Sequence, residues 1–483
     1  MGASYDVAIA GGGIVGAACA AACAAEGLSV AVVEPGPIGG GATAAGMGHI
    51  VVMDDSPAQI ALTLSSRQLW IELSGELPAD VEYLPCGTMW VAADEEELAE
   101  VRRKKRVYDE IGVRAEVVGP KELAEAEPNL RPGLAGGLFV ADDSVLYPPC
   151  AARFLLERSK AARIAQRAVE IGGGVIKLRD GTAISAGVTV NATGAWAPEL
   201  TPGIEVRKRK GHLAITDRYP GYVRAVLIEL GYLKSAHATS ADSVAFNAQP
   251  RKTGQVLIGS SRQFGAEDAS IDAHILRRML QRAEEYMPGL GKLSAIRTWT
   301  GFRAATPDKL PLIGPCPGDE RLFLATGHEG LGITTSLATG KLVAAQVMGR
   351  SWAIPAEPYL PGRKAEAHGN VSGDRNVAGQ REEASMARLD RLTIGPQVDN
   401  LPHKDTVTVS VNGVAVTVPA GAMVSAAVAM AVATFRRSVT GEARGPLCGM
   451  GICFECRVTV DGREHSRSCQ IPCAPGMEVR TDG

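Results

Sequence analysis

Residues 7–16, VAIAGGGIVG, decide the fold of this chain. The four apolar residues at the start predict a buried strand, and the Ala-rich residues 17–26 predict a helix that Gly27 ends. A second apolar run over residues 29–33 predicts another strand, with Glu34 at its end. A G-x-G-x-x-G pattern between a strand and a helix, with an acid after the next strand, is typical of a dinucleotide-binding βαβ unit.

Each residue type in this motif has a physical reason. Gly11 permits the tight turn, Gly13 lets the backbone approach a pyrophosphate, and Gly16 lets the helix and the strand pack closely. Amides at the start of the helix favour phosphate charge. We expect Glu34 to accept hydrogen bonds from ribose hydroxyls.

Length and charge limit the possible functions. The 483 residues suggest about three domain-sized units, and the net charge of −3 gives no reason to expect nucleic acid or an anionic membrane as a partner. Residues 7–25 are apolar, but no basic segment precedes them, and residues 424–435 are too short to span a bilayer. We therefore expect a cytoplasmic protein with at most peripheral membrane association.

Two later segments have the composition of flavin contacts. Residues 39–48 are rich in Gly and Ala, and a flat ring could lie against their backbone with Thr43 bonding it; a flexible loop is the alternative. His49, which follows, is a structural or a catalytic histidine. Residues 188–196 form an apolar strand that ends in small residues and Trp196. They predict a second flavin contact at the edge of the same sheet, or a plain strand and turn.

The middle of the chain has a strand-like pattern. Residues 207–262 predict an antiparallel sheet that caps the cofactor, and residues 273–286 predict an amphipathic helix. Tyr232 falls in this block and is a candidate to face the substrate, although a structural role is the alternative.

Arg303 lies among apolar residues in the stretch 299–308. A substrate carboxylate held by its planar fork would give it a partner, whereas a surface position or an acidic partner within the chain is the alternative. Residues 322–347 then predict a strand, a glycine turn and a helix. The positive end of that helix suits the negative charge of a reduced flavin.

Five of these segments occur in one order: residues 11–34, 43–46, 191–196, 299–311 and 325–334. This order resembles the D-amino acid oxidase-like superfamily of FAD enzymes over residues 4–355. The resemblance implies FAD and oxidation of a C–N bond by hydride transfer to the flavin. It implies that Arg303 holds the substrate carboxylate and that the backbone of Val169 meets the adenine. Gly301 stands where covalent members carry a cysteine, so we expect non-covalent FAD.

The predicted catalytic residues are Arg303, Tyr232 and His49. The predicted cofactor-binding residues share a place in the glycine motif or in the segments above; they are Gly11, Gly13, Ile14, Val15, Gly16, Glu34, Pro35, Thr43, Ala44, Ala45, Gly46, Val169, Ala192, Thr193, Gly194, Trp196, Gly301, Gly327, His328, Gly330, Leu331, Gly332, Ile333 and Thr334.

The end of the chain carries a second signal. Residues 406–418 predict a hairpin around Asn412-Gly413, and residues 424–436 a helix. The cysteines that follow are spaced C-x4-C-x2-C with a fourth after twelve residues, which matches a plant-type [2Fe–2S] run better than zinc. The predicted ligands are Cys448, Cys453, Cys456 and Cys469, with Cys473 as a spare thiol or a competing ligand.

This module resembles the small ferredoxin-like subunits of multi-subunit amine dehydrogenases, such as D-hydroxyproline dehydrogenase, hydrogen cyanide synthase, opine oxidase and heterotetrameric sarcosine oxidase. Those complexes usually include another flavin- or nucleotide-binding subunit. We therefore expect such a partner, besides the substrate and an electron acceptor such as a quinone or a dye.

The predicted fold class is α/β. It comprises an FAD-binding Rossmann-like domain with an antiparallel-sheet substrate domain over residues 1–355 (the capping sheet at about 207–300), a linker over 356–404, and a β-grasp-like [2Fe–2S] domain over 405–483. The predicted activity is a dehydrogenase, rather than an oxidase, of a small amino or imino acid, D-hydroxyproline or D-proline-like. Glycine oxidation to cyanide and an opine- or sarcosine-type activity are alternatives, as is an electron-transfer or assembly subunit without turnover.

Overall fold

The computed structural model describes residues 4–231, 242–363, 406–432, 434–437, 443–445 and 456–481. Tyr232, Cys448 and Cys453 lie outside the described residues. The chain divides into two compact units, residues 1–369 and 370–483, which are described separately here.

The first sheet of the first unit is the one that the glycine motif predicts. β1 (Ser4–Ala10) pairs in parallel with β2 (Val30–Val33) on one side and with β11 (Ala183–Asn191) on the other. The strand order is β17-β18-β11-β1-β2-β8, with β9 and β10 joined through β11. The remaining strands are β8 (Ala162–Ile164), β9 (Ala168–Gly172), β10 (Val175–Leu178), β17 (Leu312–Cys316) and β18 (Asp319–Thr326).

One expectation about this sheet is wrong. β11 does not lie at the edge, because it pairs with β1 and with β18. It also begins at Ala183, five residues before the start of the predicted strand. Both faces of its last residues are buried, which explains why their sequence is a continuous apolar run.

Helices pack closely around this sheet. α1 (Ile14–Ala25) contacts α10 (Gly332–Val347) and α6 (Pro148–Ser159), and α10 contacts α3 (Pro57–Leu73). A β-carbon on Gly340 of α10 would lie 2.5 Å from the Ala18 carbonyl oxygen of α1. Gly340 therefore allows a close approach of α10 to α1, and the N-termini of both helices line the cavity described below.

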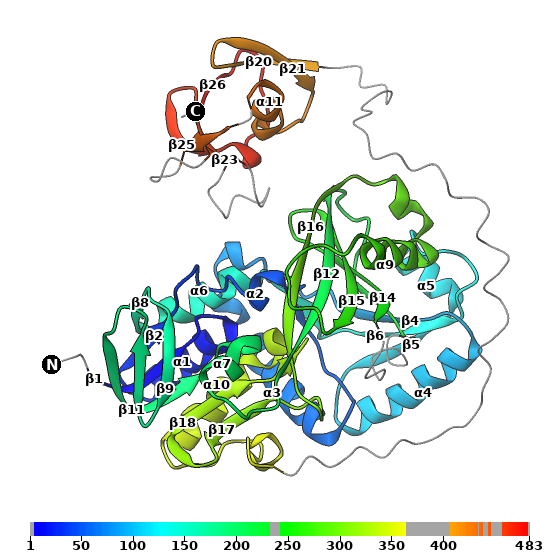
Figure 1. Ribbon diagram of the computed structural model, residues 1–483. Coiled ribbons are helices and arrows are strands. Elements are labelled where there is room, and N and C mark those ends of the chain that lie inside the picture. Colours follow the sequence, from blue (N-terminus) through cyan, green and yellow to red (C-terminus); the bar gives the residue numbers. More distant parts are fainter. Residues whose placement is uncertain are drawn as a thin grey trace. The chain divides into compact units, whose positions relative to one another are not determined.

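A second sheet of nine strands forms the cap of the first unit (Figure 1). Its order is β19-β16-β12-β15-β14-β13-β4-β6-β5, and its pairs are antiparallel except for β13 with β4. The strands are β4 (Thr88–Ala92), β5 (Ala115–Val118), β6 (Gly136–Val140), β12 (Arg207–Arg218), β13 (Val226–Glu229), β14 (Ser243–Pro250), β15 (Gln255–Phe264), β16 (Ala295–Ala305) and β19 (His328–Glu329).

The cap is therefore larger than the sequence predicted. The predicted region does supply β12 to β16, but three further strands come from residues 88–140 and one, β19, from residues 328–329. In the first of these three strands, Thr88–Ala92, all five residues are buried. α4 (Glu95–Glu110) contacts β4, β5 and β6, and α9 (Ala273–Tyr286) contacts β14 and β15.

Short elements complete the first unit: α2 (Ala42–Ala45), α5 (Pro120–Ala126), α7 (Ala197–Leu200), and β3 (His49–Ile50) paired with β7 (Ser144–Val145).

The packed chain continues past residue 355. Tyr359 is buried with its hydroxyl bonded to the Ala58 carbonyl, and Arg363 forms an ion pair of 2.7 Å with Asp308.

The second unit has a five-stranded sheet in the order β21-β20-β26-β24-β25. β20 (Thr406–Val411) and β21 (Val414–Pro419) form the predicted hairpin, with Asn412 at φ 51° and Gly413 at φ 83° in the turn. The other elements are α11 (Val424–Ala431), β22 (Arg436–Arg437), β23 (Ala443–Arg444), β24 (Arg457–Val460), β25 (Arg463–Arg467) and β26 (Glu478–Arg480). The helix ends before residue 436, since Val432 is extended and Phe435 packs into the core.

Among the described residues, we find no helix with the length and apolar character that a membrane span needs.

Candidate functional site

A cavity of about 480 Å³ opens between the glycine motif and the cap sheet. Gly11 has φ +108°, and a β-carbon on it would lie 2.5 Å from the Ala192 carbonyl oxygen. A β-carbon on Gly16 would lie 2.0 Å from the carbonyl oxygen of Gly11, whereas one on Gly13 would meet only the Thr43 hydroxyl, at 3.3 Å. The first and third glycines are thus required by packing, while Gly13 faces the cavity. This loop fits a dinucleotide pyrophosphate.

Glu34 and Thr43 organise the loop. The Glu34 carboxylate accepts hydrogen bonds from the Gly12 and Gly36 amides, both at 2.8 Å. The Thr43 hydroxyl accepts the Ile14 amide at 3.0 Å. Both side chains line the cavity and keep further hydrogen-bonding capacity, because each carboxylate oxygen has a second lone pair and the hydroxyl has its own proton.

The end of β11 supplies another wall. The Asn191 amide donates to the Ala197 carbonyl at 3.0 Å, and its oxygen accepts the Thr193 hydroxyl at 2.7 Å. These bonds hold the turn formed by residues 192–196, all of which line the cavity. Trp196 packs edge-on against Phe302 of the cap, with ring centroids 6.2 Å apart.

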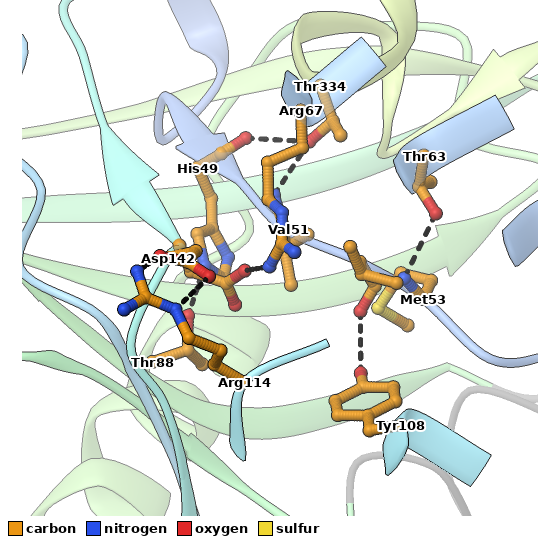
Figure 2. A network of polar contacts seen from close by, with 12 residues as sticks. His49, Val51, Met53, Thr63, Arg67, Thr88, Tyr108, Arg114, Asp142 and Thr334 are labelled. Atoms are coloured by element: carbon orange, nitrogen blue, oxygen red, sulfur yellow. Dashed lines mark hydrogen bonds and ion pairs between the residues drawn. The ribbon is translucent and has the colours of Figure 1, made fainter. Parts of the chain in front are cut away.

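His49, Val51 and Met53 also line the cavity, and hydrogen bonds to residues of β4, α10, α4 and α3 hold this segment in place (Figure 2). The His49 Nε2 lies 2.8 Å from the Thr88 hydroxyl. The Thr334 hydroxyl donates to the His49 carbonyl at 2.9 Å, and the Tyr108 hydroxyl donates to the Val52 carbonyl at 2.8 Å. Burial lowers the pKa of His49 to about 3, so the ring is neutral at neutral pH.

A buried ion pair lies next to Thr88. Arg67 Nη1 is 2.9 Å from Asp143 Oδ1, and both side chains are almost inaccessible. Burial raises the pKa of Asp143 to about 6, against the opposing effects of Arg67 and Thr88. Through Asp143, this pair supports Thr88 on β4, the residue whose hydroxyl bonds the His49 ring.

The N-terminus of α10 reaches the cavity through residues 330–333. His328, just before it, is buried, and its Nε2 lies 3.0 Å from the Thr339 hydroxyl. Burial lowers its pKa to about 3. A positive helix end at this wall is the arrangement expected next to an anionic group.

Arg303 points into the cavity from β16. Its Nη1 donates to the Ser261 carbonyl at 2.9 Å. A β-carbon on Gly211 would lie 2.5 Å from Nη1, and one on Gly330 would lie 3.5 Å from Nε, so two glycines leave room for the guanidinium. Arg303 lines the cavity and is half-buried, as a residue that holds a substrate carboxylate requires.

Further charged residues, which the sequence reasoning missed, line the same end. Arg209 Nη1 is 2.8 Å from Glu329 Oε1, and Arg262 Nε is 3.8 Å from the same oxygen. Burial acts to raise the pKa of Glu329, but Arg262, Arg303 and Arg209 lower it to about 2. Lys309 also lines the cavity. Together with Arg303, these residues come from four separate strands and a turn, and no local spacing in the sequence connects them.

The cavity brings together most of the predicted site residues. Those that line it are Gly11, Gly13, Ile14, Val15, Glu34, Pro35, Thr43, Ala45, Gly46, His49, Ala192, Thr193, Gly194, Trp196, Gly301, Arg303, His328, Gly330, Leu331, Gly332 and Ile333. Those that do not line it are Gly16, Ala44, Val169, Gly327 and Thr334.

The five residues outside the lining have other visible roles or positions. Gly16 and Gly327 have no room for a β-carbon, and the Thr334 side chain bonds residues 49 and 51. Ala44 is exposed on α2, and Val169 is half exposed next to Ala168, which does line the cavity. Gly301, which stands where covalent members of the superfamily carry a cysteine, lines the cavity, and non-covalent FAD stays a prediction.

The second unit contains the two predicted cluster ligands that can be described. The sulfur atoms of Cys456 and Cys469 lie 3.2 Å apart in the core, and both side chains are buried. The Ser468 hydroxyl donates to the Cys456 carbonyl at 2.6 Å and fixes the turn between them. Two thiol groups this close fit shared ligation of a cluster. Cys473 is buried in the same apolar core, and burial raises its pKa.

Comparison with known families gives two matches that together cover most of the chain. A model described as "FAD dependent oxidoreductase" matches residues 6–346, and one described as "2Fe-2S iron-sulfur cluster binding domain" matches residues 404–483. The predicted fold class and cofactor types are therefore confirmed.

Individual relatives agree with the first match. Glycine oxidase of Geobacillus kaustophilus is 29% identical over 371 residues, which cover 74% of this chain and 96% of that protein. Hydrogen cyanide synthase subunit HcnC of Pseudomonas aeruginosa is 30% identical over 423 residues, which cover 75% of this chain and 97% of that protein.

Solved structures show the same similarity. The crystal structure of glycine oxidase from Geobacillus kaustophilus superposes with a TM-score of 0.68 at 28% identity, covering 75% of this chain and 99% of that one. The crystal structure of L-proline dehydrogenase from P. horikoshii gives a TM-score of 0.67 at 25% identity, covering 75% and 98%.

Proposed function

Because this chain belongs to the FAD dependent oxidoreductase family and ends in a 2Fe-2S cluster binding domain, we propose that it is a dehydrogenase of a small amino or imino acid. Bound FAD supplies the hydride acceptor for oxidation of the substrate C–N bond, and the cluster supplies a path for single electrons. The proposed final acceptor is a partner protein or a quinone. The chain's own residues provide binding, orientation and charge.

The observation that carries this proposal is the position of Arg303. Its guanidinium lies in the cavity that the glycine motif also lines, held by the Ser261 carbonyl. A substrate carboxylate on this fork would be fixed in orientation relative to the nucleotide loop. The neutral ring of His49 and the side chain of Trp90 line the same cavity. His49 is therefore proposed to orient the substrate, since its buried ring is not a cation at neutral pH.

D-Hydroxyproline or D-proline is the first specific substrate candidate, on the resemblance of the 327–335 stretch to hydroxyproline dehydrogenase-type chains. Glycine is the second candidate. Two of the relatives support it by name, since one is a glycine oxidase and one is a subunit of hydrogen cyanide synthase.

An anaerobic titration tests the proposal. The purified full chain, loaded with flavin and cluster, is mixed with D-hydroxyproline, D-proline, glycine and sarcosine while the flavin band near its absorbance maximum is followed. Bleaching by one of these amines is the expected result. In a separate aerobic assay, a dye is expected to reoxidise the reduced flavin more rapidly than oxygen does. A flavin that none of a broad panel of amino acids bleaches would instead indicate an electron-transfer or assembly subunit.

A further inference from the structure

The cap sheet presents an unusual concentration of positive charge to the cavity. Arg209 on β12 is the direct antiparallel partner of Arg303 on β16, so the two side chains leave the same face. Arg262 reaches the cavity from β15, and Lys309 reaches it from the turn after β16. Like charges on directly opposed strand positions are destabilising unless negative charge lies between them.

The chain supplies only part of that negative charge. Glu329 lies 2.8 Å from Arg209 and 3.8 Å from Arg262. Among the described residues that line this end of the cavity, Asp55 is the second carboxylate, and its side chain is exposed. Those described residues therefore place four cations against two carboxylates, an excess of two positive charges.

The acids at the other end of the cavity do not alter this balance. Glu34 is bonded to two loop amides, and Glu199 on α7 lies 3.8 Å from Lys208. Both belong to the part of the cavity that the first sheet forms, where Arg167 also lies. The excess of positive charge is thus confined to the cap end of the cavity, where Arg303 lies.

We propose that this end of the cavity binds a substrate with two carboxylates. One carboxylate lies on Arg303, and the second lies in a subsite formed by Arg262 with Arg209 and Lys309. Arg262 is the residue that sets specificity for the second carboxylate. The inference rests on the proposed function and narrows it to amino or imino dicarboxylic acids, in preference to monocarboxylates such as D-proline and glycine.

The physical reason is desolvation. The side chains of Arg262 and Arg209 are 7% and 11% exposed, so their charges have little water around them. An anion that enters such a site gains more from each cation than it would at the surface, and a planar guanidinium pairs with a carboxylate in a defined geometry. An uncharged group of the same shape gains nothing equivalent and loses its own hydration.

The first test uses dead-end ligands and does not depend on turnover. Glutarate and butyrate are titrated into the full FAD-loaded protein, and their dissociation constants are obtained from the change in the flavin spectrum. We expect glutarate to bind at least about tenfold more tightly than butyrate. In Arg262→Gln that ratio falls to about one, whereas Arg262→Lys keeps part of it. Arg207→Gln, which removes one exposed charge from the same strand as Arg209, leaves the ratio unchanged.

A second test distinguishes where the additional carboxylate is attached. D-Glutamate is compared with D-glutamine, and iminodiacetate with sarcosine, for bleaching of the flavin. A tenfold or greater preference for D-glutamate over D-glutamine indicates that the second carboxylate lies on the side chain. The same preference for iminodiacetate over sarcosine indicates that it is attached through the nitrogen. Either result supports the proposal. Equal binding of glutarate and butyrate by the unchanged protein overturns it, as does an unaltered ratio in a folded Arg262→Gln variant. Bleaching only by monocarboxylates overturns the inference and leaves the dehydrogenase proposal in place.

Discussion

The guanidinium of Arg303 lies against the α-carbon of Gly211 on the neighbouring strand. A β-carbon at residue 211 would approach Nη1 to 2.5 Å and Cζ to 2.9 Å, closer than real β-carbons approach other atoms. The obstacle is the far end of a flexible side chain rather than backbone. A side chain at residue 211 is thus expected to displace the arginine and to leave the sheet intact.

Gly211→Ala tests this relationship. We expect KM to rise about tenfold or more, because the Arg303 guanidinium loses its position. The flavin content and Tm should stay near those of the unchanged protein. Gly75→Ala is the matched control, since a β-carbon there has no atom within 4 Å. Unchanged KM in Gly211→Ala would mean that the observed position of Arg303 is not the one that binds substrate.

Arg303→Ala removes the fork itself. A charge-assisted hydrogen bond contributes about 1.5–3 kcal/mol, so kcat/KM should fall by about 10- to 150-fold. Most of the loss should appear in KM, and Arg303→Lys should recover little because its ammonium lacks the planar geometry. Steady-state kinetics with a dye acceptor measure both constants. Arg297→Ala, which removes an arginine from the same strand outside the cavity, should keep the original values.

Two cysteines of the second unit offer a paired test. Cys469→Ser should lose iron, acid-labile sulfide and the visible absorbance of the cluster, since its sulfur lies 3.2 Å from that of Cys456. Cys473→Ser should keep all three, because its buried thiol is the predicted spare. Loss of the cluster in Cys473→Ser with retention in Cys469→Ser would exchange the two assignments.

The buried His328 predicts a pH dependence of stability. Burial lowers its folded-state pKa to about 3, below the ordinary value of 6.5. The unfolded chain therefore takes up a proton below about pH 6.5 that the folded chain refuses until about pH 3. Stability is lost as the pH falls through this window, by about 1.4 kcal/mol per pH unit.

The comparison of His328→Gln with the unchanged protein isolates this contribution. Between pH 6 and 4.5, Tm of the unchanged protein should fall more steeply than Tm of the variant. Asp143 and Glu127, whose pKa values are raised to about 6 and about 7 by burial, contribute with the opposite sign, but equally in both proteins. Parallel Tm curves would show that His328 becomes protonated in the folded state well above pH 3.

The local patterns of the chain predicted many of its elements. The βαβ unit around Gly11, the helices α9 and α10, and the Asn412-Gly413 hairpin follow the spacing of apolar residues and the turn residues. The extent of the cap sheet could not be predicted from local patterns. β4 pairs in parallel with β13, across more than a hundred residues of chain, and such a pairing leaves no local pattern.

By itself the sequence determined the nucleotide loop, the cluster-binding run and the identity of Arg303 as a candidate for substrate binding. Each depends on residues that are close in the chain, so spacing alone carries the information. Only the tertiary structure decided that Arg209, Arg262, Lys309 and Glu329 share one end of one cavity with Arg303. Their charges act through space, and the sheet that brings them together is held by pairings between distant strands.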